Sequence, residues 1–496
     1  MYTTVPPVLV GAVLGVVAHH GLFIHGEWHI QAPSVLVTHL AGFFYLALVV
    51  KAGWQIISGY LLALSFSILI YRVFFHRLKH FQSPFLASTS KIWHVWEARD
   101  SKNHFFLQEL YRECGDFVRT GPSEITVFHP GVFMAVDGPS SKCGRAEWYD
   151  LLHPNTGLVT TREKELHRER RGGGIKVPTA ALAQYKSKIL PPLNQLDDCL
   201  KADIVAGQAS NVSNLVFWLT FDRMGEFVLG RSFDMLRNQQ WHSIILLLQK
   251  AMSLLGPLGP TPWAVQIAFK LMPRVGVLRD WFTMVGWCEN QVRKIPVRDS
   301  ISAIVAGSEP TASTLIGLIY ELAKQPSQAE KLRNEILQTG AYIHDSSSLA
   351  RYCPHLEAAI FEALRLYPSI PSAGNRKMSS NEGVTVAGIY IPLETTVVAP
   401  RFVIGRREDC FENADAFVPE RWTTSPEMVP NRAAFAPCIG RALAMNDLML
   451  VTAHIVYYYW MRFPPGETGD SVIDDWKDNF TSTLGQLSLM FELRGD

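Results

Sequence analysis

Three long apolar runs stand within the first 75 residues of this 496-residue chain. They cover Val8–Phe23, Ser34–Val50 and Ile56–Phe75, and the last is long enough to cross the ~30 Å hydrocarbon core of a bilayer. A single segment in hydrocarbon satisfies its own backbone polar groups only as a helix, so these runs predict N-terminal transmembrane helices. The first run has a second interpretation as a buried or re-entrant segment, because His19 and His20 lie inside it.

Charged residues near these runs predict the orientation of the chain. Arg72, Arg77 and Lys79 end the third run, whereas residues 26–33 hold no Lys or Arg. By the positive-inside rule, the chain after residue 76 is expected in the cytosol and, with three spans, the N-terminus in the lumen. A secretory signal would be a single shorter run with a cleavage site, so a retained anchor fits better.

The composition excludes some classes of protein. With 46 basic and 45 acidic residues, the net charge of +1 offers no basic field for a nucleic acid, and none is expected as a partner. The seven cysteines are scattered without C-x-x-C pairs. This spacing argues against a zinc site and a disulfide framework, and it suits a reducing compartment.

One cysteine, Cys438, stands in the segment Phe-Ala-Pro-Cys-Ile-Gly-Arg just before an apolar helical pattern. The free N–H groups and positive dipole of a helix N-terminus stabilise a thiolate, so Cys438 is a candidate metal ligand. Gly440 has no Cβ and allows a flat cofactor to lie close to the backbone. Buried cysteines more often serve as small hydrophobic residues, so this segment alone also fits plain packing.

Further motifs precede this cysteine in a fixed order. They are Ala-Gly-Ser-Glu-Pro-Thr at 306–311, Glu-Ala-Leu-Arg at 362–365 and Pro-Glu-Arg-Trp at 419–422. In this order, from about residue 115 to the C-terminus, the sequence resembles the cytochrome P450 family of heme-thiolate monooxygenases. The resemblance implies a mainly α fold with a small β-rich subdomain, preceded by N-terminal transmembrane helices. Residues 1–79 would then form a membrane anchor of about three helices, and residues 80–496 the heme-thiolate catalytic domain.

The resemblance also implies roles for particular residues. Cys438 would be the proximal ligand of heme b, with Gly440 beside it, and Thr311 and Glu309 would deliver protons to bound dioxygen. The other implied heme contacts are the propionate partners His167, Arg171 and Arg376. The implied substrate-pocket residues are Ala303, Ala306, Gly307, Ile370, Pro371 and Ser372. The charged run at 163–171, read without the resemblance, fits an ordinary solvated helix face.

A charge triad is implied beneath the cysteine segment. Glu362 and Arg365 share a helix face at i, i+3, and the resemblance adds Arg421 as their buried partner. Without the resemblance, the pair fits a surface ion pair that contributes ~0–1 kcal/mol. Alternation also predicts hairpins at 117–127 and 383–392, and Asp299 and Ser300 are candidate caps of a long helix that contains Pro310.

Two departures from the family pattern stand out. The family writes Phe-x-x-Gly-x-Arg-x-Cys-x-Gly, but Ala434 and Ala436 take the places of its glycine and arginine, as if the segment were shortened. Pro296 lies ten residues before Ala306, so the long helix is expected to lack its usual N-terminal part.

These features predict a monooxygenase of the endoplasmic reticulum membrane, multi-pass, with a cytosolic catalytic domain. It would insert one oxygen atom of O2 into a lipophilic small molecule of secondary metabolism, such as a terpenoid. Electrons would come from NADPH through a separate flavoprotein reductase. The open alternatives are epoxidation, desaturation or ring coupling by the same cofactor, a catalytically impaired member of the family, and a non-catalytic membrane protein that keeps the fold.

Overall fold

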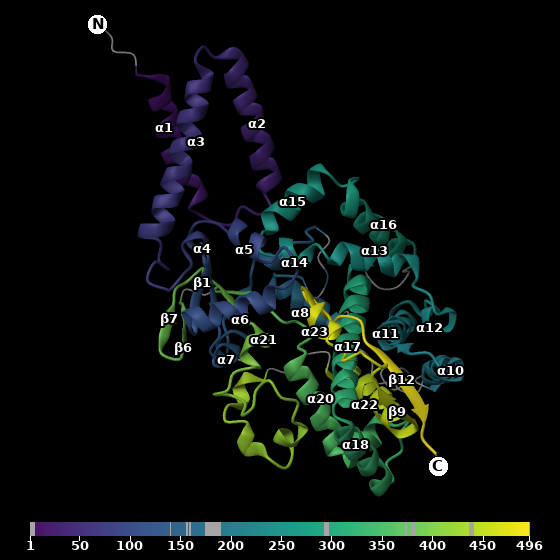
Figure 1. Ribbon diagram of the computed structural model, residues 1–496. Coiled ribbons are helices and arrows are strands. Elements are labelled where there is room, and N and C mark those ends of the chain that lie inside the picture. Colours follow the sequence, from purple (N-terminus) through teal and green to yellow (C-terminus); the bar gives the residue numbers. More distant parts are fainter. Residues whose placement is uncertain are drawn as a thin grey trace.

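The computed structural model describes residues 5–138, 140–154, 157, 160–173, 190–291, 297–372, 374–378, 382–435 and 441–495. Cys438 and Gly440 lie outside these residues. The chain is mainly helical with small sheets, which confirms the predicted fold class. Three N-terminal helices stand out from one side of a larger helical body (Figure 1).

The N-terminal helices correspond to the three apolar runs. Helix α1 (Pro7–Ala18) continues as a π-helical turn to Phe23, α2 covers Ala32–Val49, and α3 (Gly53–Ile70) continues as a π-helical turn to Phe75. By length and composition, Ala32–Val49 and Gly53–Phe75 can cross a membrane, whereas the apolar segment Pro7–Phe23 is shorter. Both interpretations of the first run therefore stay open.

Glycines bring the backbones of α1 and α3 into contact. A Cβ atom at Gly11 would lie 2.1 Å from the Ile56 carbonyl oxygen, and one at Gly59 would lie 2.1 Å from the Val8 carbonyl oxygen. Gly15, one turn after Gly11, is also buried. Small residues four apart commonly allow membrane helices to approach closely. The first helix is therefore packed tightly on the third.

The long helix α17 (Val297–Lys324) runs through the centre of the body (Figure 1). It packs on α11 (Val212–Leu229), α20 (Pro354–Leu366) and α22 (Arg441–Tyr458) in one large apolar core. The other described helices of the body are α4 (Phe85–Thr89), α5 (Ile92–Glu97), α6 (Asn103–Cys114), α7 (Val132–Asp137), α8 (Lys164–Gly173), α10 (Leu190–Ala206), α12 (Met235–Asn238), α13 (Ser243–Met252), α14 (Leu255–Leu258), α15 (Pro262–Leu271), α16 (Gly276–Gln291), α18 (Pro326–Thr339), α19 (Ser346–Tyr352), α21 (Arg401–Ile404) and α23 (Ser471–Asp474).

Helix α17 differs from the prediction at its start and its middle. It begins at Val297, before the candidate caps, and Asp299 therefore lies in the first turn, where a negative charge is favourable. Pro310 lies inside the helix, which continues through it to Lys324. Proline removes one backbone hydrogen bond, and burial of the following turns in the core offsets this loss.

The described strands form small sheets at the edges of the helical core. The largest has the order β1-β2-β8-β5-β3, with strands Phe117–Gly121, Glu124–Val127, Thr396–Val398, Arg376–Met378 and Cys143–Arg145. The others are β4-β12-β9 (Ser210–Asn211, Ser488–Leu493, Tyr459–Arg462), β6-β7 (Val384–Val386, Ile389–Ile391) and β10-β11 (Lys477–Asn479, Thr481–Thr483). Both predicted hairpins are confirmed by the antiparallel pairs β1-β2 and β6-β7.

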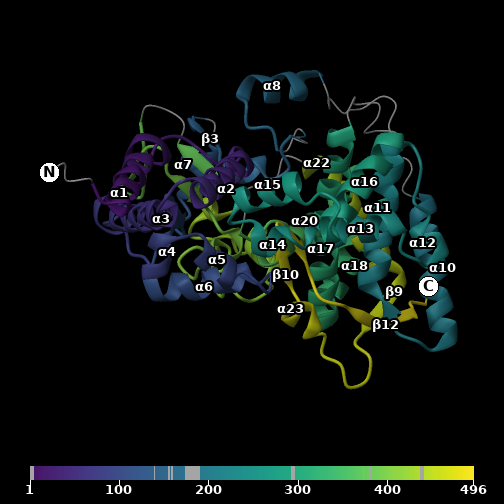
Figure 2. The same cartoon turned by 90° about the horizontal axis from the view of Figure 1, so that it is seen from above.

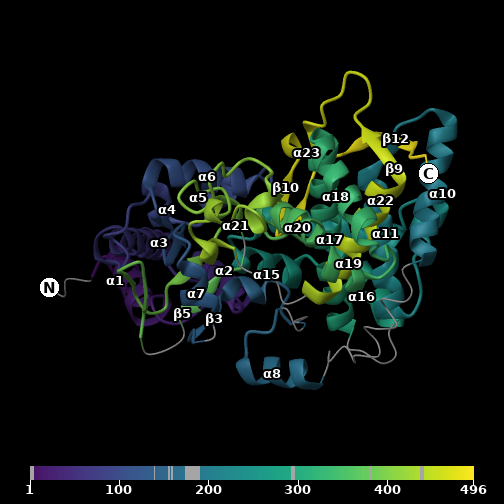
Figure 3. The ribbon, with the colours of Figure 1, turned by 90° about the horizontal axis from the view of Figure 1, so that it is seen from below.

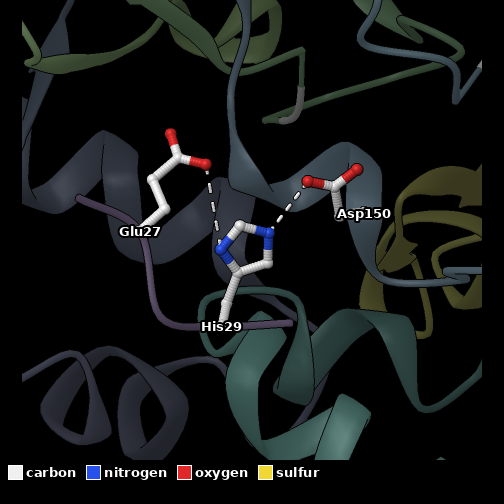
Figure 4. A group of neighbouring side chains, drawn as sticks. All are labelled: Glu27, His29 and Asp150. Atoms are coloured by element: carbon white, nitrogen blue, oxygen red, sulfur yellow. Dashed lines mark hydrogen bonds and ion pairs between the residues drawn. The ribbon is translucent and has the colours of Figure 1, made fainter. Parts of the chain in front are cut away.

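A cluster of ion pairs fixes the loop between α1 and α2 to the body (Figure 4). The two oxygens of Glu27 accept hydrogen bonds from Arg162 at 2.7 and 2.9 Å, and Lys377 donates to Glu27 at 2.6 Å. Arg162 also donates to Asp150 at 2.5 Å, and the same carboxylate oxygen lies 2.8 Å from His29 Nε2. We call these five residues the loop clamp.

The loop clamp is an ion-pair cluster and not a metal site. Glu27, His29 and Asp150 do have ligand atoms within 4.8 Å of one another. The two carboxylates, however, face different nitrogens of the His29 ring, Glu27 towards Nδ1 and Asp150 towards Nε2 (Figure 4). Arg162 and Lys377 already bind these carboxylates. A metal ion would have to displace both of these cations.

The loop clamp makes the stability of the fold depend on the charge of Glu27. Burial opposes ionisation of this carboxyl, but hydrogen bonds from Arg162 and Lys377 outweigh burial and lower its pKa from 4.5 to about 2. A carboxyl whose pKa is lower in the folded protein stabilises the fold above its unfolded pKa. This stabilisation is lost as the pH falls from about 4.5 towards 2.

We expect Glu27→Gln to lower the free energy of unfolding at pH 7 by about 1–3 kcal/mol, because two partly buried cations lose their shared carboxylate. The difference from the unchanged protein should shrink between pH 5 and pH 3. Chemical unfolding of the full chain in detergent at several pH values measures both effects. The control is Glu394→Gln, which removes an exposed ion pair with Arg77. Equal losses in the two variants at pH 7 would contradict the loop clamp.

Candidate functional site

Two polar residues lie buried in the middle of α17. The Glu309 carboxylate accepts a hydrogen bond of 2.6 Å from the Thr481 hydroxyl on β11. Burial raises the pKa of Glu309, and the hydrogen bond from Thr481 opposes this rise only in part. The Thr311 hydroxyl donates to the Gly307 carbonyl oxygen at 2.8 Å. Glu309 is thus a group that holds a proton more readily than an exposed glutamate does.

One face of α17 is open, although residues 311–323 are buried. Ala306 is exposed, and Ala303, Gly307 and Pro310 are half-buried. Their spacing of three, one and three places them on one side of the helix. Pro310 has no N–H, so the Ala306 carbonyl lacks its usual helical partner. We call these four residues the open stripe.

The open stripe fits a flat cofactor. Three of its four residues are Ala or Gly, so the surface is level and apolar, and the Thr311 hydroxyl follows directly after it. These are suitable groups for the face of a heme on which dioxygen binds. Cys438 and Gly440, the implied heme contacts on the other side, lie outside the described residues.

The structure brings the implied charge triad together at the C-terminal end of α20. Arg365 donates to the two oxygens of Glu362 at 3.0 and 2.7 Å, and Arg421 Nε donates to the same carboxylate at 2.9 Å. All three side chains are fully buried. The Trp422 indole N–H and the Val418 backbone N–H also donate to Glu362, at 2.8 and 3.0 Å.

Backbone carbonyls satisfy the remaining N–H groups of the two arginines. Arg365 donates to the carbonyl oxygens of Gly405, Ala414 and Ala416, and Arg421 donates to those of Glu412, Asn413 and Met428. The triad therefore holds the chain between residues 405 and 428, which leads towards the cysteine segment. Its role in placing that segment stays a prediction.

The implied propionate partners meet other residues in the structure. His167 lies on α8, which stands at the edge of the molecule (Figures 2 and 3), and its Nε2 is 3.2 Å from Arg145 Nη2. Arg376 donates to Asp137 at 2.6 Å and to the Tyr149 hydroxyl at 2.8 Å. The side chain of Arg171 lies outside the description. The structure thus places these residues without testing their contact with heme.

A large cavity lies between the N-terminal helices and the body. Its volume is about 830 Å³, and α2, α3, α5, α14, α15 and the β10-β11 hairpin contribute to its wall. Among the implied pocket residues, Ser372 lines this cavity. Pro371, next to it, is buried, and Ile370 is half-buried. The remaining three, Ala303, Ala306 and Gly307, belong to the open stripe.

Sequence reasoning missed several polar residues of this cavity. Asp478 is buried in its wall, and the loop-clamp residues Glu27 and His29 line it as well. Asp478 stands in a segment with other acids, Asp474 and Asp475, so its type and spacing do not single it out. Glu27 meets partners more than 100 residues away, which no local pattern reveals.

We expect Arg421→Met to lower the free energy of unfolding by about 3–5 kcal/mol, because the buried Glu362 would lose one of its two cations. The control is Lys331→Met, which breaks a partly exposed ion pair with Glu420 and should cost ~0–1 kcal/mol. Chemical unfolding in detergent measures both. A loss in Arg421→Met no larger than in the control would show that the triad does not hold this region.

Comparison with known proteins adds independent evidence. A family model described as Cytochrome P450 matches residues 298–486. The chain is 32% identical to cytochrome P450 monooxygenase FCK2 of Fusarium pseudograminearum, with 97% of each chain covered. It is 30% identical to cytochrome P450 monooxygenase notG' of Aspergillus versicolor, with 98% of each chain covered. It is also 29% identical to tryprostatin B 6-hydroxylase of Aspergillus fumigatus, covering 97% of this chain and 95% of that one.

These similarities extend over nearly the whole chain, including the N-terminal helices. They agree with the ordered motifs, the buried triad and the mainly helical fold. The chain belongs to the cytochrome P450 family and is a P450 monooxygenase.

Proposed function

We propose that this P450 inserts one oxygen atom of O2 into a lipophilic small molecule of fungal secondary metabolism. The observation that carries the proposal is the open stripe of α17, with the Thr311 hydroxyl directly after it and the buried Glu309 within it. The fungal relative named as a tryprostatin B 6-hydroxylase supports hydroxylation as the reaction. The predicted terpenoid substrate rests on analogy alone.

Heme b held by the Cys438 thiolate would supply the oxidising chemistry of the family. Around it, His167, Arg171 and Arg376 are the candidate partners of its propionates. In the structure Arg376 is bound to Asp137, so an exchange of this ion pair would accompany propionate binding. The open stripe would face the opposite side of the cofactor.

The residues of α17 provide a way to hold and deliver protons. Glu309 keeps a proton on its carboxyl because burial raises its pKa, and Thr481 orients that carboxyl. The Thr311 hydroxyl is oriented by the Gly307 carbonyl, and its oxygen can accept a hydrogen bond from a water. The two residues together would order a water at the open stripe.

Electrons would come from NADPH through a separate flavoprotein reductase. The N-terminal helices would hold the protein in the endoplasmic reticulum membrane, with the catalytic domain in the cytosol. The support for this location is the two helices long and apolar enough to cross a bilayer. A cavity wall shared by α2 and α3 would receive a lipophilic substrate from the bilayer.

A second candidate function is a catalytically impaired member of the family. The alignment with the Fusarium relative extends over 548 positions, more than the 496 residues of this chain, so the relative holds residues where this chain has none. The shortened cysteine segment agrees with this difference. Epoxidation, desaturation and ring coupling also stay possible, and isotopic oxygen in the product separates them from hydroxylation.

The test of the proposed function is heme binding through Cys438. We expect the purified full chain to contain about one heme per chain and to show the strongly red-shifted Soret band of a thiolate ligand in its reduced carbonyl complex. Cys438→Ala should abolish this band, and the control Cys114→Ala should keep it. An unchanged band in Cys438→Ala would remove the assignment, whereas absence of heme in the unchanged protein would favour the impaired alternative.

We expect Thr311→Ala to lower product formed per NADPH consumed by about tenfold or more, because a positioned proton relay contributes about 10²–10⁴-fold. NADPH consumption should fall much less, and the lost oxygen should leave as peroxide. A reconstituted reductase system measures product, peroxide and NADPH together. The control is Thr314→Ala, which removes an equivalent hydroxyl bond to the Pro310 carbonyl one turn later. Full coupling in Thr311→Ala would assign the relay to other residues.

A further inference from the structure

The cavity between the N-terminal helices and the body combines an apolar lining with one polar wall. Leu36 and Phe43 of α2, Trp263 and Ile267 of α15 and Phe480 of the β10-β11 hairpin provide apolar side chains. A volume of about 830 Å³ is within the range of ~300–1,000 Å³ typical of small-molecule sites. The shape and lining therefore suit one lipophilic molecule.

The polar wall is a continuous chain of hydrogen bonds. The Ser372 hydroxyl donates to the Asp478 carboxylate, and Asn103 Nδ2 donates to Ser372 at 2.9 Å. The Asn103 carbonyl oxygen lies 2.8 Å from His94 Nε2, and His94 Nδ1 lies 2.9 Å from Lys91 Nζ. All five residues line the cavity. The chain orients the Asp478 carboxylate from behind.

Asp478 differs from the other acids of this wall because no ion pair compensates it. Lys91 pairs with Glu124, and Lys377 pairs with Glu27 and Glu147. Among the described residues Asp478 has no cationic partner within an ion-pair distance. Its side chain is only 3% exposed, and burial raises its pKa to about 7, against hydrogen bonds from Ser372 and the Phe480 backbone.

A buried carboxylate without a cation is costly, and protein interiors normally compensate such a group. The hairpin itself does not require this charge, because a neutral amide would accept the same hydrogen bonds from Ser372 and Phe480. A ligand that brings an N–H donor or a cation into the cavity would compensate it. Perturbed acids that line a cavity are characteristic of binding sites.

We propose that Asp478 determines substrate specificity, by binding a protonated amine or another N–H donor of an otherwise lipophilic substrate. This proposal rests on the proposed function, since the occupant is taken to be the substrate of the monooxygenase. The apolar part of the substrate would lie against α2, α15 and Phe480. Asp478 is a binding residue here and takes no part in oxygen transfer.

The hairpin that carries Asp478 also reaches the catalytic helix. Thr481, three residues further on, donates to Glu309 of α17. The adjacent Ser482 accepts a hydrogen bond from Ser313 of the same helix. A substrate bound to Asp478 is thereby held by the same strand pair that holds Glu309. This connection places the nitrogen of the substrate at a fixed position relative to the open stripe.

The test measures binding to the full chain in dodecyl maltoside, whose headgroup has no nitrogen. The probes are 3-butylindole, its N-methyl analogue without the N–H, and (4-phenylbutyl)trimethylammonium, which cannot bind iron through nitrogen. Equilibrium dialysis against empty micelles gives each affinity. We expect the unchanged protein to bind 3-butylindole about tenfold more tightly than the N-methyl analogue, because one hydrogen bond to a charged group is at stake.

The variants separate the two kinds of ligand. Asp478→Ala should remove the preference for the indole N–H and weaken binding of the ammonium probe about 10–100-fold. Asp478→Asn keeps an oxygen acceptor, so it should retain the indole preference if the ligand is a neutral N–H donor and still lose the ammonium probe. The control Asp475→Asn removes an exposed acid of the same segment and should change nothing.

Three results would overturn the proposal. They are equal binding of both indoles together with no binding of the ammonium probe, identical affinities in Asp478→Ala and the unchanged protein, and displacement of 3-butylindole by a short-chain phosphatidylcholine, which would make a lipid headgroup the occupant. Dialysis needs neither reductase nor turnover. An inactive protein with Asp478-dependent binding would therefore contradict the proposed function and not this site.

Discussion

The carboxylate of Glu362 holds together the part of the fold that leads to the cysteine segment. Its two oxygens bind Arg365, Arg421 and Trp422, and the arginines in turn bind carbonyl oxygens between residues 405 and 428. Burying three charges is expensive, and only complete hydrogen bonding offsets the cost. The loop around residues 405–428 therefore cannot shift without leaving a buried charge unpaired. This makes a long irregular segment rigid where the fold must place a cofactor ligand.

The extent to which sequence predicts this structure follows the distance over which each feature is encoded. Glu362 and Arg365 share a helix face, so their pairing is local, and the family pattern adds Arg421. The hairpins at 117–127 and 383–392 are also set by local alternation and turns. Pro310 inside α17 runs against local propensity, because burial of the helix outweighs the lost hydrogen bond. The loop clamp joins Glu27 to Lys377, 350 residues away, and only tertiary packing defines it.

The N-terminal residues take part in the structure of the body as well as in its attachment to a membrane. The predicted division assigns residues 1–79 to an anchor and residues 80–496 to the catalytic domain. The loop clamp crosses this boundary, and so does the cavity, whose wall includes α2 and α3. Arg162 lies just before α8, which carries His167. The anchor loop therefore influences the segment that carries a candidate heme partner.

The β10-β11 hairpin unites the two parts of the proposed site. One end of it presents Asp478 and Phe480 to the cavity, and the other end binds α17 through Thr481. Because Glu309 is buried and its pKa is raised, its proton is sensitive to any movement of the Thr481 hydroxyl. A ligand that neutralises Asp478 removes the reason for this hairpin to shift towards solvent. Binding of the substrate and the proton supply would then depend on one short element, and this gives a physical reason for placing the specificity residue on it.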